Sequence, residues 1–71
     1  MQHIIKYVDG VSDAHPRELE FEVAPSFDAA WDRANDRIPE LRAKHGLRVD
    51  YVIEDMTGRR AMIGPGRYGD A

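Results

Sequence analysis

The clearest pattern in the chain is a strict alternation of apolar and acidic residues within positions 17–24. The alternating residues are Glu18, Leu19, Glu20, Phe21, Glu22 and Val23. Successive side chains of a β-strand point to opposite faces of the sheet, so the pattern predicts a strand over residues 17–24. We expect the three apolar residues to face the core and the three glutamates to face water.

A second strand is predicted at residues 3–8, which are rich in β-branched and aromatic side chains and precede the turn pair Asp9-Gly10. Both of its faces are partly apolar. Ile5 and Tyr7 lie on one face, and Ile4 and Val8 lie on the other. Apolar residues on both faces are typical of a strand that is covered on both sides. Either face of this strand can therefore pack against a helix.

Apolar residues then recur at steps of three and four, the spacing of one helix face. They are Phe27, Ala30, Trp31, Ala34, Ile38, Leu41 and His45. Ser26 is placed to cap the first turn of this helix. Gly46 follows the last turn, where a residue with a positive φ ends the helix. Pro39 removes one internal hydrogen bond. Because the apolar stripe stays in phase across Pro39, we predict one bent helix instead of two.

Two further strands follow the helix. Residues 48–54 place Val49, Tyr51 and Ile53 on one face. Residues 59–63 return after a turn in which Gly58 takes the positive-φ position.

The order β-β-α-β-β predicts an α+β domain, with a four-stranded, mainly antiparallel sheet and one Pro-kinked helix packed on one face. We assign the domain to residues 1–64 and expect residues 65–71, which have no periodicity, to form a flexible tail.

Composition narrows the function classes. The chain has 71 residues, no cysteine, three histidines and a net charge of −3. A core of this size contributes only about 3–5 kcal/mol, and without disulfides self-association becomes the favoured supplement. The histidines lack metal-ligand spacing, so we predict no metal and no cofactor.

No signal peptide or membrane-spanning segment is evident, which makes a cytoplasmic location the expectation. Eight of the ten basic residues are arginine, which suggests a bacterial or phage genome.

The sheet face opposite the helix is the main candidate for function. We expect an apolar centre there with a polar rim, which is typical of a protein-binding surface. The centre is predicted to contain Ile4, Val8, Val52 and Met62, and the charged rim Glu18, Glu20 and Glu22. The sequence therefore predicts a small protein-interaction module, homodimeric through this face or through an edge strand, that regulates or inhibits a protein partner.

The glycine-rich C-terminal segment indicates an alternative function. Arg59, Arg60, Arg67 and Tyr68 offer guanidinium planes and one aromatic ring on which unpaired bases can stack. This combination would suit a weak binder of single-stranded nucleic acid. The negative net charge disfavours it.

Enzymatic activity is not expected. The two serines lie in turn or cap contexts, and no nucleophile-elbow or phosphate-loop spacing occurs. An active site assembled from His and Asp side chains at a dimer interface is the remaining enzymatic hypothesis. Acidic residues at four-residue steps on the helix, beginning with Asp28, are most simply a solvated helix face.

Overall fold

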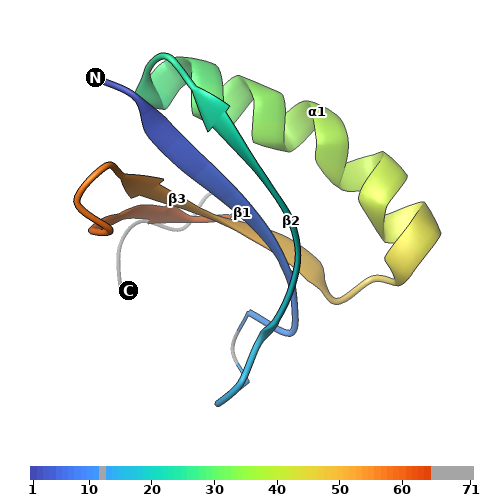
Figure 1. The fold of residues 1–71 in the computed structure, drawn as a ribbon. Coiled ribbons are helices and arrows are strands. Elements are labelled where there is room, and N and C mark those ends of the chain that lie inside the picture. The colour runs from blue at the N-terminus through green and yellow to red at the C-terminus, as the bar shows by residue number, and fades with distance from the viewer. Residues whose placement is uncertain (12, 65–71) are drawn as a thin grey trace.

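The computed structural model describes residues 1–11 and 13–64. The strands are β1 (His3–Asp9), β2 (Arg17–Ala24), β3 (Val49–Asp55) and β4 (Arg60–Ile63), and the helix is α1 (Phe27–His45). They form one four-stranded sheet in the order β2-β1-β3-β4 with every neighbouring pair antiparallel. The helix packs on one face of this sheet (Figure 1). The predicted α+β fold is confirmed.

The helix begins and ends at the predicted residues. The Ser26 side chain accepts a hydrogen bond from the backbone N–H of Ala29 at 3.1 Å, which satisfies one of the N–H groups that a helix start leaves unpaired. Gly46, at a φ of 112°, donates its N–H to the carbonyl of Arg42. α1 continues across Pro39, so the prediction of one helix is correct.

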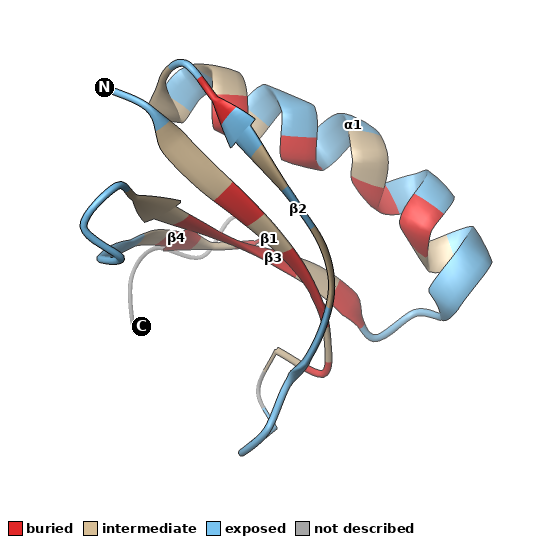
Figure 2. Cartoon of the chain, viewed as in Figure 1, coloured by how far each residue is buried: buried red, intermediate tan, exposed pale blue. Residues whose placement is uncertain are grey.

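The core lies between α1 and the two central strands. Ala30, Ala34, Ile38 and Leu41 form the buried side of α1, which faces the sheet (Figure 2). They pack with residues from all four strands, namely Ile5, Tyr7, Ala24, Val49, Tyr51, Ile53 and Met62. His45 is exposed, so its predicted place in the apolar stripe is wrong.

The strand β2 differs from its prediction. Phe21 is 67% exposed and Val23 is 53% exposed, so neither belongs to the core. Directly opposite residues of an antiparallel pair share a face, and the buried Ile5 and Tyr7 are paired with Glu22 and Glu20. The glutamates therefore lie on the helix side of the sheet and the two apolar residues on the other side.

Each edge strand contains a β-bulge, and at this bulge the alternation of side chains between the two faces of the sheet is interrupted. Tyr7 pairs with Glu20 but Val8 pairs with Glu18, so Leu19 is the extra residue in β2. Leu19 packs against the core from the same side as Glu20. A second irregularity, between Ile53 and Glu54, makes Ala61 the extra residue in β4. One inserted residue moves every following side chain of the strand to the opposite face of the sheet.

Candidate functional site

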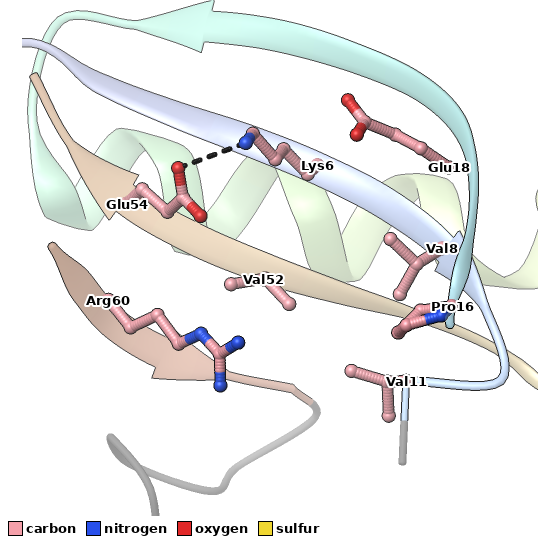
Figure 3. Close-up of a pocket in the computed structure, with 8 residues that line it drawn as sticks. All are labelled: Lys6, Val8, Val11, Pro16, Glu18, Val52, Glu54 and Arg60. Carbon is pink, nitrogen blue, oxygen red and sulfur yellow. Dashed lines mark ion pairs between the residues drawn. The ribbon is translucent and has the colours of Figure 1, made fainter. Parts of the chain in front are cut away.

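The sheet face turned away from α1 is the candidate site, and we call it the open face. The strand register places on it Ile4, Lys6, Val8, Glu18, Phe21, Val23, Asp50, Val52, Glu54, Arg60 and Ile63. Six of these eleven residues are apolar, and they come from all four strands. The helix lies behind this face in Figure 3 and covers none of it.

The two most exposed apolar residues of the open face lie side by side on the edge strand. Phe21 pairs with Lys6, and Val23 pairs with Ile4, which is half-buried. Exposed apolar residues that occur singly are common on protein surfaces, whereas neighbouring ones on a flat sheet are typical of contact surfaces. This part of the open face is therefore an apolar strip along β2 and β1.

A shallow hollow of about 210 Å³ lies at the other side of the open face (Figure 3). Val8 and Val52, both buried, belong to its lining, and the Lys6 ammonium contacts the Glu54 carboxylate across it at 3.2 Å. The remaining lining residues are Val11, Pro16, Glu18 and Arg60. Small-molecule pockets usually measure about 300–1,000 Å³, so this hollow better suits a single side chain of a partner protein.

The structure brings together three of the four apolar residues predicted for this surface. Ile4, Val8 and Val52 lie on the open face. Met62 does not: it is fully buried on the helix side, where the Tyr51 hydroxyl donates to its sulfur at 3.9 Å. Its predicted place is wrong because the bulge at Ala61 reverses the faces of β4, and Ile63 is paired with Val52 instead.

The predicted row of three glutamates is divided between the two faces. Glu18 lies on the open face and belongs to the hollow's lining. Glu20 and Glu22 lie on the helix side, so they form no part of a rim around the open face. The bulge at Leu19 separates Glu18 from the other two.

Glu20 and Glu22 instead belong to a polar network that joins β2 to α1. The Arg37 guanidinium donates to Glu22 and to Glu20, each at 3.0 Å, and Arg33 donates to Glu22 at 2.8 Å. The Tyr7 hydroxyl also donates to Glu22, at 2.8 Å, and Arg37 lies over the Tyr7 ring, 5.2 Å from its centre. The network fixes the edge strand to the flank of the helix.

The ionisation of this network follows from its contacts. Burial acts to raise the pKa of Glu22, but hydrogen bonds from Arg37, Tyr7 and Arg33 outweigh it and hold that pKa below its ordinary value. Burial, together with the bond to Glu22, raises the pKa of Tyr7 well above its ordinary value. The bond to Glu22 also raises the pKa of Arg37. Glu22 is therefore charged at neutral pH and Tyr7 is neutral.

Residues proposed for nucleic-acid binding are only partly described. Arg59 and Arg60 are exposed at the β3–β4 hairpin, and Arg60 reaches the hollow. Arg67 and Tyr68, with the whole predicted tail at 65–71, lie outside the described residues. Binding of single-stranded nucleic acid through these four residues stays a prediction.

The described residues contain neither a metal centre nor a membrane-spanning helix. No group of three or more His, Cys, Asp or Glu side chains in residues 1–11 and 13–64 is arranged to hold a metal ion. The helix in the same part of the chain is not apolar enough to span a membrane.

Sequence reasoning missed Phe21, Val23 and Ile63 as residues of the open face. One signal for the first two was present. Arg33 and Arg37 are spaced to line one flank of the helix, as Glu20 and Glu22 line one face of the strand. Matching these two pairs would have turned the glutamates toward the helix and the apolar residues away from it.

Comparison of the chain with protein-family models, curated proteins and solved structures gave no match.

Proposed function

We propose that this protein is a protein-interaction module that forms a homodimer through the open face. The observation that supports the proposal is the exposure of Phe21 and Val23, at 67% and 53%, beside Ile4 on a sheet face that the helix leaves uncovered. Removing such side chains from water contributes about 25 cal/mol per Å² of apolar area. A second copy would supply the missing cover.

The charges of the open face are compatible with a contact between identical surfaces. The open face has two basic residues, Lys6 and Arg60, and three acidic residues, Glu18, Asp50 and Glu54. The Asp50 carboxylate contacts Arg42 of α1 at 3.1 Å, which leaves two acidic residues to match the two basic ones. A two-fold symmetric interface brings the same patch of both subunits together, so a patch with a large net charge would repel its copy. The open face has no such excess.

The size of the face sets the expected strength of the dimer. Four strands spaced about 4.8 Å apart, with a rise of about 3.3 Å per residue, give a plan area of roughly 500 Å². Two such faces would bury on the order of 1,000 Å², the lower end for specific interfaces. We therefore expect a reversible dimer with a dissociation constant in the micromolar range or weaker.

The dimer is proposed to act on another protein as a regulator or inhibitor, and no catalytic step is needed for that role. Of the residues first assigned to the contact, Ile4, Val8, Val52 and Glu18 stay in the proposal. Met62, Glu20 and Glu22 leave it because they lie on the helix side.

Sedimentation velocity between about 10 µM and 1 mM tests the proposed dimer. The wild-type protein should sediment faster as its concentration rises, and the double variant Phe21→Ser/Val23→Thr should remain monomeric while keeping the wild-type circular dichroism spectrum. Leu47→Ser is the matched control, because Leu47 is 86% exposed but lies between α1 and β3, outside the open face. A wild-type protein that is monomeric at 1 mM, or a double variant that dimerises like wild type, would overturn the proposal.

A further inference from the structure

The outer edge of β2 is a long strand edge that no described residue pairs with. β2 has eight residues and is the first strand in the sheet order, while the other edge strand, β4, has only four. Alternate backbone N–H and C=O groups of an edge strand point outward, where they are able to pair with another extended chain. An extended peptide of about eight residues would match the length of β2.

The end of this edge lies next to a hollow between the strand and the helix. This hollow of about 290 Å³ is lined by Glu22, Val23, Ala24, Pro25, Ala29 and Arg33. Residues 29, 33, 36 and 40 recur at steps of four, three and four, so they share one side of α1. The hydrogen bond from Arg33 to Glu22 shows that this side is turned toward β2. A strand added to β2 would thus run beside the helix.

The charge around this edge is strongly negative. Residues 17–40 contain seven carboxylates and three arginines, a net charge of −4, whereas the whole chain has −3. Arg33 and Arg37 already contact Glu20, Glu22 and Glu40. The excess negative charge of the protein is therefore concentrated on β2 and the adjoining part of α1, which favours a basic occupant.

A second copy of this chain fits the edge poorly. Antiparallel pairing of β2 with itself would place glutamates of one copy opposite glutamates of the other, because residues on one face pair with residues on the same face. Like charges directly opposite each other destabilise a strand pair. The occupant that suits this edge belongs to a different protein.

We propose that β2 binds an extended basic segment of a partner protein by strand addition. Basic residues at alternate positions of that segment would lie on the helix side of the sheet, toward the side of α1 that carries Asp36. They would lie beside the ion pairs that Glu20 and Glu22 make with Arg33 and Arg37. The residues between the basic ones would lie on the open-face side, next to Phe21 and Val23, and should be apolar or β-branched. The inference goes beyond the homodimer, because it relies on the backbone edge and the helix flank and does not require a second copy.

Fluorescence anisotropy with a labelled ten-residue peptide that alternates lysine with threonine or valine tests this proposal. We expect saturable binding to the protein at about 50 mM salt and weaker binding at 500 mM. The control peptide has the same side chains but N-methylated amides at alternate positions, which preserves its charge and removes the donors needed for a strand pair. Equal binding of the two peptides, or no binding of either, would overturn strand addition.

A protein variant and a spectroscopic readout locate the binding. Asp32→Asn/Asp36→Asn removes two exposed carboxylates from α1 and should weaken binding on the order of threefold to tenfold. Asp13→Asn, a carboxylate outside residues 17–40, should leave binding unchanged. Backbone amide NMR shifts should move at residues 17–24 and not at residues 56–63; the reverse pattern would also overturn the proposal. Peptide binding is measured on the wild-type protein at a concentration at which sedimentation shows a monomer, so failure of the homodimer and failure of this site are distinguishable.

Discussion

The central strands β1 and β3 and the edge strand β2 belong to one sheet, yet they are held in place by different forces. β3 contributes Val49, Tyr51 and Ile53, all fully buried, and β1 contributes Ile5 and Tyr7. β2 contributes one buried residue, Ala24, and is attached to the helix through Glu20 and Glu22. Hydrophobic burial thus holds the centre of the sheet, and hydrogen-bonded ion pairs hold its edge.

This difference has a functional consequence. Because polar contacts fix β2 from the helix side, its apolar residues Phe21 and Val23 are not needed for the core and remain exposed. Its outer backbone edge remains exposed as well. The part of the molecule that is held most weakly by burial is therefore the part through which both proposed contacts would be made.

The largest expected effect comes from removing a buried side chain of a central strand. Ile53→Ala leaves a cavity beneath α1 and should reduce the free energy of unfolding by about 2–5 kcal/mol, enough to unfold much of a small domain. Val23→Ala, on the edge strand, should change it by less than about 0.5 kcal/mol. Urea unfolding followed by circular dichroism measures both. Similar losses for the two variants would mean that the edge strand also depends on burial.

A smaller loss is expected when the polar attachment of β2 is removed. Arg37→Met keeps most of the side-chain volume but loses the bonds to Glu20, Glu22 and Glu40, and should lower the free energy of unfolding by about 1–2 kcal/mol. Hydrogen exchange should become faster in β2 and stay unchanged in β3. Lys44→Met, an exposed change in the last turn of α1, serves as the control. Equal acceleration in both strands would contradict a separate attachment of the edge.

The smallest effect is a pH dependence that belongs to Glu22. Its pKa in the folded protein lies below the ordinary value of 4.5 that the unfolded chain is expected to show. Its stabilising contribution is therefore present above pH 4.5 and is lost as the pH falls through the folded pKa. Wild type should melt at a higher temperature than Glu22→Gln at pH 7, and the difference should shrink as the pH falls below 4.5. A difference that stays constant over this range would show that the charge of Glu22 contributes nothing.

The parts of the fold that were predicted correctly depend on local signals. Ser26 and Gly46 define the two ends of the helix through contacts within one turn, and Gly58, at a φ of 85°, defines the hairpin. The central strands were also assigned correctly, because runs of β-branched and aromatic residues favour extended backbone. Residues near in sequence carry this information.

The candidate site was predicted only in part, and the errors lie in the two edge strands. Met62 was placed on the open face, and Phe21 and Val23 in the core, on the assumption of unbroken alternation. Bulges at Leu19 and Ala61 break that alternation in the two edge strands. No glycine or proline at either position marks the bulge, so the sequence gives no local warning.

The sequence by itself determined the order of the elements, the caps of the helix and the existence of two distinct faces on β2. Only the tertiary structure decided which of those faces meets the helix. Alternation with a period of two distinguishes the faces but does not orient them, and one extra residue exchanges them. The orientation of β2 followed from Arg33 and Arg37, which offer partners to Glu20 and Glu22 only after α1 has packed on the sheet. In an isolated strand these glutamates would be hydrated. In the folded protein they lie at the helix flank, because ion pairs with the arginines there replace their hydration.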